Sequence, residues 1–212
     1  MHTHLCPATY LEIGVACGDS FHLPGAQTRA IGIDPAPRVP YALRPQQKLF
    51  ALTSDDFFAR HDPIAELGGQ RVQMAFIDGM HHFEFALRDF ANVEAVCDPR
   101  AVIFIHDCHP IDARSAAREQ STSFWSGDVW RLIVLLKRHR PDLRVHTLAT
   151  PPTGLGMITH LSPASRLIRE NLPALTAEGL ALDFAQIASR KPEVLNVFPN
   201  DWPRVRALLD DR

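Results

Sequence analysis

Short apolar runs alternate along the chain with amphipathic stretches, which is the pattern of strands that are each followed by a helix. Residues 101–105 form the most apolar run, and their unbroken hydrophobicity predicts a central strand covered on both faces. Six further strands are predicted, at residues 8–15, 30–33, 48–52, 72–77, 143–148 and 156–161. We therefore expect a mostly parallel seven-stranded sheet in which the last strand pairs antiparallel with the one before it.

Apolar residues at three- and four-residue spacing predict helices between these strands. Residues 83–97 carry one such face, and residues 129–136 carry another. Ser54 is expected to cap a helix whose first turn holds two acids, as the helix dipole favours. Ahead of the second strand only a short helix is expected, because Pro24 and Gly25 interrupt the segment.

The regular alternation covers residues 8–161 and predicts an α/β fold, a three-layer doubly wound sheet in a domain of residues 1–161. From Ser162 onward prolines break the pattern into short helical pieces. Residues 162–212 are expected to form a C-terminal helical appendage that packs on the domain or on a second copy of the chain in a homo-oligomer. His2 and His4 are assigned to a frayed terminus.

Composition limits the classes of partner. The chain has 212 residues, enough for one domain with a sizeable core, and its net charge of -2 favours neither nucleic acid nor an anionic membrane. No apolar run approaches the ~20 residues that span a bilayer, and no secretory leader is visible. The four cysteines form no Cys-x-x-Cys pair and are expected to be reduced and mostly buried, as in a cytoplasmic protein. A small diffusible molecule is the expected partner.

A glycine-containing turn follows the first strand. Glu12, Gly14 and Gly18 lie where this strand breaks, and glycine lets a ligand approach the backbone closely. Asp34 ends the next strand, 22 residues after Glu12, where a carboxylate can bind both hydroxyls of a ribose. Ala16 replaces the middle glycine of the Gly-x-Gly-x-x-Gly pattern, which argues against a pyrophosphate and hence against a nicotinamide-dependent dehydrogenase. The alternative interpretation is an ordinary turn beside a solvated aspartate.

Acids and imidazoles follow two neighbouring strands of the predicted sheet. Asp78 and His81 come directly after one strand, and His106 and Asp107 come after the next. Because ligands bind beyond the carboxyl ends of parallel strands, we expect these side chains to meet at one edge of the sheet. Each histidine taken alone could instead be a loop or helix-cap residue bonded to backbone. Two nearby histidines are lesser candidates: His82 and His109.

The chain resembles the class I S-adenosylmethionine-dependent methyltransferases over about residues 8–161. The motifs that carry this resemblance are residues 10–14 (the first motif), 32–34 (the ribose-binding acid) and 54–55 (the adenine-side loop). Residues 76–84 together with 105–107 more narrowly resemble the branch that includes bacterial sugar O-methyltransferases acting on macrolide glycosides. The resemblance implies a Rossmann-like methyltransferase fold and an S-adenosylmethionine site formed by Glu12, Gly14, Gly18, Asp34, Ser54, Asp55 and Asp78.

The same resemblance implies a hydroxyl acceptor, whose high pKa calls for a general base and preferably a cation. In related metal-dependent O-methyltransferases the first acid lies 28 residues before an acidic pair, and Asp78 precedes His106 by the same interval. The implied metal ligands are therefore Asp78, His106 and Asp107. Histidine at the first position of the pair departs from the pattern and leaves Mg²⁺, Mn²⁺, Fe²⁺ or no metal as alternatives. His81 is the implied base, Asp78 the second catalytic residue, and a sugar or glycoside hydroxyl the implied acceptor.

Surrounding positions carry weaker predictions. Trp125, Asp128 and Trp130 either wall a sugar pocket or pack a helix N-terminus on the core. Arg88 and Asp89 are expected on a helix surface. The alternative functions are a catalytically silent S-adenosylmethionine-binding accessory protein of a glycan or natural-product pathway, an accessory role in hydroxylation and, last, a dehydrogenase.

Overall fold

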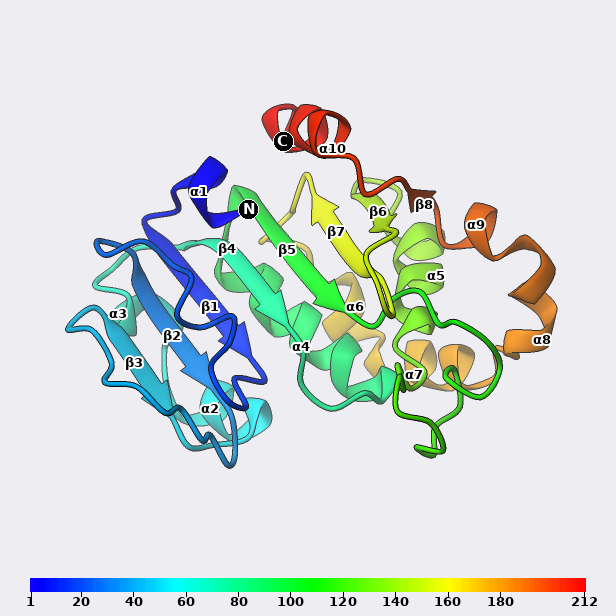
Figure 1. Ribbon diagram of the computed structural model, residues 1–212, viewed down its shortest axis with the longest axis horizontal. Coiled ribbons are helices and arrows are strands. Elements are labelled where there is room, and N and C mark those ends of the chain that lie inside the picture. The colour runs from blue at the N-terminus through cyan, green and yellow to red at the C-terminus, as the bar shows by residue number, and fades with distance from the viewer.

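An eight-stranded sheet runs through the computed structural model, which describes residues 1–212 (Figure 1). Its strand order is β3-β2-β1-β4-β5-β7-β6-β8. Strand β7 runs antiparallel to both of its neighbours, and every other neighbouring pair is parallel. The strands are β1 (Thr9–Ile13), β2 (Arg29–Ile33), β3 (Gln47–Phe50), β4 (Val72–Ile77), β5 (Cys97–His106), β6 (Arg144–Leu148), β7 (Leu155–Thr159) and β8 (Val197–Phe198).

The predicted α/β doubly wound fold is confirmed, with one more strand than expected. All seven expected strands are present, and the last two of them pair antiparallel as predicted. The additional strand β8 has only two residues and pairs with β6 through Thr147 and Leu148. Two residues between Asn196 and Pro199 are too few to show an alternating pattern, so the sequence carried no sign of this strand.

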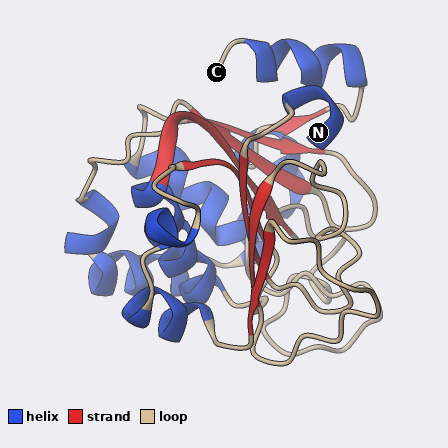
Figure 2. Cartoon of the chain, turned by 90° about the vertical axis from the view of Figure 1, so that its left-hand side faces the viewer, coloured by secondary structure: helices blue, strands red, loops and turns tan.

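Helices cover one face of the sheet, whereas loops cover most of the other, with α1 and α10 at one end (Figures 1 and 2). The helices at 83–97 and 129–136 were predicted, and they form as α4 and α5. The complete set is α1 (His2–Leu5), α2 (Ser54–Arg60), α3 (Pro63–Glu66), α4 (Phe83–Val96), α5 (Trp130–His139), α6 (Leu167–Glu170), α7 (Leu172–Leu180), α8 (Phe184–Ile187), α9 (Lys191–Val194) and α10 (Trp202–Asp210), with a 3-10 turn at Ala188–Arg190.

The core has two parts because alternate residues of a strand point to opposite faces. On β5, Ile103 and Ile105 belong to the larger cluster under the helices, and Val102 and Phe104 belong to the smaller cluster under the loops. All four side chains are buried. The prediction of a central strand covered on both faces is therefore confirmed.

Two local predictions were wrong. The short helix expected ahead of β2 does not form, and turns interrupted by Pro24 and Gly25 fill that segment instead. The cap of α2 is Thr53 rather than Ser54, because the Thr53 hydroxyl accepts a hydrogen bond from the Asp56 N–H at 3.1 Å. Ser54 is thus the first helical residue.

The N-terminal segment packs on the fold, so the expectation of a frayed terminus was wrong. The His2 ring lies 4.7 Å from the Tyr10 ring, edge to face, and His4 Nε2 lies 2.9 Å from Asp210 Oδ1 on α10. All four cysteines are free thiols, and two of them are buried, Cys97 and Cys108. None of the helices combines the length and hydrophobicity needed to cross a bilayer.

Residues 162–212 pack against the helical layer and the sheet. Leu175 and Leu195 join the larger core cluster, and Val205 joins the smaller one. On α7, a Cβ added to Gly179 would lie 2.2 Å from the Phe83 ring, so this helix packs closely against the start of α4. In this structure the segment is part of the packed fold of the same chain.

Candidate active site

The carboxyl ends of β1, β2 and β4 lie side by side. The Gly14 N–H donates to the Ile33 carbonyl at 2.8 Å, and the Asp78 N–H donates to the Ile13 carbonyl at 2.8 Å. These two bonds continue the sheet past its last paired residues. The turn after β1 and the acid after β4 are consequently neighbours, as sequence reasoning expected.

Gly14 is required by this close approach of the two strand ends. Its φ of +87° lies in the left-handed region, and a Cβ there would meet the Asp78 carbonyl oxygen at 1.9 Å. The protein's own backbone therefore occupies the side of Gly14 where sequence reasoning expected a ligand.

Asp34 holds the turn that follows β1. Its Oδ2 accepts a hydrogen bond from the Ala16 N–H at 2.8 Å, and its Oδ1 accepts one from the Ala36 N–H at 2.7 Å. Ala16 has a φ of +47°, a conformation that costs a non-glycine residue about 1 kcal/mol and that the Asp34 carboxylate stabilises. Each carboxylate oxygen keeps one further lone pair, so Asp34 retains the capacity to bind a ribose.

Gly18 lies beneath an aromatic side chain. The Tyr41 hydroxyl donates to the Gly18 carbonyl at 2.7 Å, and a Cβ on Gly18 would lie 2.6 Å from that hydroxyl oxygen. A glycine at this position is thus explained by Tyr41, which comes from the proline-rich loop after β2.

Glu12 is fully buried on the loop-covered face of the sheet. Its carboxylate accepts hydrogen bonds from the Tyr10 hydroxyl and from the Ser20 hydroxyl, both at 2.6 Å. Burial raises the pKa of Glu12 to about 7, although these two bonds act in the opposite direction. Through Ser20, Glu12 ties the far end of the glycine turn back to β1.

Asp55 points away from the strand ends toward α4. Its carboxylate forms a bidentate ion pair with Arg88, at 2.7 Å from Nη2 and 3.1 Å from Nε. Ser54 contributes the first residue of α2. Seven residues were expected to hold the donor, and one of them, Asp78, is described below with the acceptor residues. The other six are called the donor edge: Glu12, Gly14, Gly18, Asp34, Ser54 and Asp55.

Asp89 was expected on a helix surface, and that prediction was wrong. Its side chain is only 3% exposed, and its buried Oδ1 has no hydrogen-bond partner. Burial raises the pKa of Asp89 to about 7, against a smaller lowering effect of Ser54. The helical spacing indicates that Asp89 is buried. It lies three residues after buried Ala86 and four before buried Val93, on the inward face of α4.

Four side chains converge where β4 and β5 end, and they are called the acceptor cluster: Asp78, His81, His106 and Asp107. His81 Nε2 lies 3.1 Å from Asp107 Oδ2 and 3.7 Å from Asp78 Oδ1. His106 Nδ1 lies 3.2 Å from Asp107 Oδ1 and 3.4 Å from Asp78 Oδ1. The structure therefore brings together all the predicted catalytic and metal-binding residues.

Two buried atoms of the acceptor cluster have no aligned hydrogen bond despite these short distances, His106 Nδ1 and Asp107 Oδ2. Asp107 has a φ of +64° and is only 2% exposed, so its carboxylate is held in a strained, buried position. One ligand atom each from Asp78, His81 and Asp107 lie within 4.8 Å of one another. Beside them is a cavity of about 10 Å³, room for roughly a single water or ion.

Charge coupling within the acceptor cluster favours imidazolium beside carboxylate. Burial alone would raise the pKa of Asp78, but the imidazoles of His106 and His81 outweigh it and lower that pKa to about 2. Burial alone would lower the pKa of His106, but Asp107 and Asp78 raise it to about 10. The pKa of His81 is also raised, by Asp78 and Asp107 against burial. A divalent cation would replace these protons.

His81 is oriented from its other ring nitrogen. Its Nδ1 lies 3.0 Å from the Trp125 carbonyl oxygen, and the two rings stack at a centroid distance of 5.0 Å. Because a carbonyl and a carboxylate only accept, hydrogen is favoured on Nδ1, which faces Trp125, and on Nε2, which faces Asp107. Nε2 can accept a proton only from the neutral ring whose hydrogen is on Nδ1. Of the three predicted pocket-wall residues, only Trp125 is partly exposed, since Asp128 and Trp130 are fully buried.

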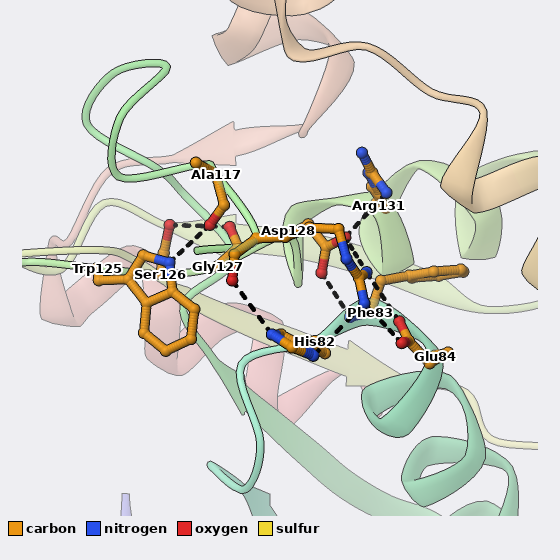
Figure 3. Close-up of polar contacts among 10 residues, drawn as sticks. His82, Phe83, Glu84, Ala117, Trp125, Ser126, Gly127, Asp128 and Arg131 are labelled. Carbon is orange, nitrogen blue, oxygen red and sulfur yellow. Dashed lines mark hydrogen bonds and ion pairs between the residues drawn. The ribbon is translucent and has the colours of Figure 1, made fainter. Parts of the chain in front are cut away.

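The two lesser histidines lie outside the acceptor cluster. His82 Nε2 is 3.2 Å from the Arg118 carbonyl oxygen. Figure 3 shows His82 beside Phe83, at the start of α4. A Cβ on Gly154 would lie 2.3 Å from the His109 Cβ, so His109 packs against the loop before β7. His82 matches the loop or helix-cap interpretation of a histidine, whereas the buried His109 Nε2 has no hydrogen-bond partner.

Part of the chain is similar to a known family of domains. A family model described as "Methyltransferase domain" matches residues 11–108, which include the glycine turn and the whole acceptor cluster. No curated protein sequence matches the chain.

Solved structures share the fold at low sequence identity. An O-methyltransferase from Bacillus cereus in complex with SAH has 14% identity and a TM-score of 0.51, over 72% of this chain and 73% of that one. The O-methyltransferase TomG from Streptomyces achromogenes, involved in tomaymycin synthesis and solved with SAM, has 14% identity and a TM-score of 0.53, over 74% of each chain. An SAH-bound methyltransferase from Podospora anserina has 14% identity and a TM-score of 0.55, over 73% of this chain and 72% of that one.

Proposed function

We propose that this chain is a class I S-adenosylmethionine-dependent methyltransferase, as its similarity to a methyltransferase family model and its fold support, and that it transfers the methyl group to a hydroxyl of a sugar or glycoside. The observation that carries the proposal is the acceptor cluster. Two carboxylates and two imidazoles meet within hydrogen-bonding distance at the edge where β1 and β4 end together. That edge is where ligands of parallel α/β folds bind.

The residues of the acceptor cluster supply a base beside a binding site for hydroxyls. An acceptor hydroxyl close to His81 Nε2 would lose its proton to that atom as its oxygen attacks the methyl carbon. The new bond is oxygen to carbon, the broken bond is sulfur to carbon, and S-adenosylhomocysteine leaves. Asp78 and Asp107 stabilise the resulting imidazolium, as the raised pKa of His81 indicates.

A divalent cation fits the same residues. Asp78, His81 and Asp107 each offer one ligand atom within 4.8 Å of the others. The buried His106 Nδ1, which has no aligned partner, lies 3.4 Å from Asp78 Oδ1 and is a further candidate ligand. Such an ion would bind the acceptor hydroxyl and lower its pKa. A mixed set of imidazole and carboxylate ligands suits Mn²⁺ or Fe²⁺ better than Mg²⁺, which prefers oxygen ligands.

Exposed apolar side chains flank the stacked pair of His81 and Trp125. Met80 is 56% exposed and Phe124 is 58% exposed, and each is next in the chain to one member of that pair. Exposed apolar side chains beside a polar centre favour an acceptor that carries an apolar body next to its hydroxyls. A glycoside with an apolar aglycone has this character.

The test measures donor binding and turnover separately. Calorimetry with S-adenosylhomocysteine should show saturable binding to the wild type and at least tenfold weaker binding to Asp34→Ala. His81→Ala should bind the same compound as tightly as the wild type but transfer no labelled methyl group to a panel of glycosides. Equal affinity of Asp34→Ala and wild type would refute the donor-site assignment.

A catalytically silent donor-binding accessory protein is the second candidate. The observation that favours it is that His81 Nε2, the atom a base would use, already lies 3.1 Å from Asp107 Oδ2 and 3.7 Å from Asp78 Oδ1. An accessory protein would bind S-adenosylhomocysteine, transfer no methyl group to any acceptor and be unaffected by His81→Ala.

A further inference from the structure

No side chain adjacent in sequence caps the N-terminus of helix α4. Its N-cap residue, His82, makes no side-chain cap hydrogen bond. The first helical N–H, that of Phe83, instead donates to Asp128 Oδ1 at 2.7 Å, across a separation of 45 residues. In Figure 3 Asp128 lies between this helix start and Arg131. A distant, fully buried acid therefore fixes the first turn of α4.

Asp128 also binds the backbone of the segment that precedes α4. Its own N–H donates to the His81 carbonyl oxygen at 3.2 Å. The preceding Gly127 fits only as glycine, because a Cβ would lie 1.8 Å from that same oxygen. One residue thus holds both the backbone of the base His81 and the start of the helix that follows it.

Arginines hold the Asp128 carboxylate in place. Arg118 Nη1 lies 2.6 Å from Asp128 Oδ2, and Arg131 Nη1 lies 2.8 Å from the same oxygen. Arg118 also forms a bidentate pair with Glu84, at 2.7 and 2.9 Å. Because Glu84 lies in the first turn of α4, Arg118 links the helix start to the loop between β5 and α5 twice.

This arrangement sets the position of the carbonyl that orients the base. Trp125, whose carbonyl oxygen faces His81 Nδ1, lies only three residues before Asp128. Its indole N–H donates to the Ala117 carbonyl at 2.6 Å, which ties it into the same loop (Figure 3). The chain from Trp125 to Asp128 is therefore clamped at both ends around His81.

We propose that Asp128, locked by Arg118, is a positioning residue that holds the Trp125 carbonyl against His81 Nδ1 and so directs His81 Nε2 toward Asp107. Nothing in this role requires Asp128 to touch substrate. The inference rests on the proposed function, because the tautomer of His81 matters for catalysis only if His81 is the base. Its test is nevertheless independent of turnover.

The test reads the His81 ring nitrogens by ¹⁵N NMR of the histidine-labelled full chain, at a pH above the imidazole titration. The wild type should show a single tautomer with hydrogen on Nδ1, assigned through the signal lost in His81→Gln. Asp128→Asn keeps one acceptor oxygen for the Phe83 N–H but loses the negative charge that pairs with Arg118. This variant should show a mixture of both His81 tautomers. Its turnover should fall about tenfold with unchanged affinity for S-adenosylhomocysteine.

A matched control separates this effect from a general loss of stability. Asp183 Oδ1 accepts a hydrogen bond from the Ala185 N–H at 3.0 Å and caps α8, so Asp183→Asn removes the same charge from a helix cap elsewhere. It should leave the His81 nitrogens unchanged. Arg118→Gln is the replacement variant if Asp128→Asn does not fold, and it should give the same mixture of His81 tautomers. A folded Asp128→Asn or Arg118→Gln protein with the wild-type tautomer would overturn the inference, whatever the outcome of the methyl-transfer assays.

Discussion

The donor edge and the acceptor cluster lie side by side, yet their polar groups are satisfied in opposite ways. At the donor edge, Asp34 accepts two backbone N–H groups and Glu12 accepts two hydroxyls. In the acceptor cluster, His106 Nδ1 and Asp107 Oδ2 are buried without an aligned partner. The first region is complete as folded, whereas the second keeps buried polar atoms that a ligand or ion would satisfy.

The largest expected effect is a loss of turnover in Asp107→Asn, which tests the acceptor side of the comparison. Removing the charge that lies 3.1 Å from His81 Nε2 and 3.2 Å from His106 Nδ1 should lower methyl transfer by about 10²–10⁴-fold. The control is Asp98→Asn near the opposite end of β5, where Asp98 only accepts a hydrogen bond from the Arg100 N–H. Equal losses in the two variants would contradict a special role for Asp107.

The next effect concerns the contact between the two regions, at Gly14. Gly14→Ala should lower the free energy of unfolding by about 3 kcal/mol or more, because the new Cβ adds a clash with the Asp78 carbonyl to a left-handed backbone. Gly69 has a similar φ of +84° with nothing within 4 Å of the added Cβ, so Gly69→Ala should cost only about 1 kcal/mol. Urea unfolding measures both values, and equal costs would show that the strand ends are not in contact.

The third effect is a pH dependence set by Asp89. Because burial raises the pKa of Asp89 in the folded protein to about 7, above the ordinary value of about 4, the folded state holds this proton more tightly. Stability therefore falls as pH rises from about 4 to about 7. Asp89→Asn removes that loss, although its amide remains buried. The variant should therefore gain on the order of 2 kcal/mol relative to wild type between pH 5 and pH 8. A pH-independent difference in urea unfolding would contradict the buried, protonated carboxyl.

The smallest effect is expected at the donor edge, from Tyr41→Phe. Losing the hydrogen bond to the Gly18 carbonyl should cost about 1 kcal/mol of stability and leave the ring in place over the turn. If Tyr41 must move when donor binds, the variant should bind S-adenosylhomocysteine about fivefold more tightly, because the closed loop is weakened. Weaker binding in calorimetry would show instead that the Tyr41 hydroxyl contributes to the donor site.

Sequence reasoning succeeded where the pattern is local and repeated. The strand ends at Asp34, Asp78 and His106 followed from apolar runs and their polar successors, and the strands there formed as expected. It failed where a distant segment decides the outcome. Asp128 caps α4 across 45 residues, and Tyr41 covers Gly18 from 23 residues away. Asp89 was misplaced for another reason, because charge was weighed above its position on the buried face of α4.

The proposal that the acceptor cluster binds a divalent ion is tested by electron paramagnetic resonance of Mn²⁺ titrated into the wild-type protein and into Asp107→Asn. The account predicts that the wild type removes one equivalent of free Mn²⁺ signal per chain and that Asp107→Asn removes none. Failure of the wild type to bind Mn²⁺, or equal binding by the variant, would contradict it.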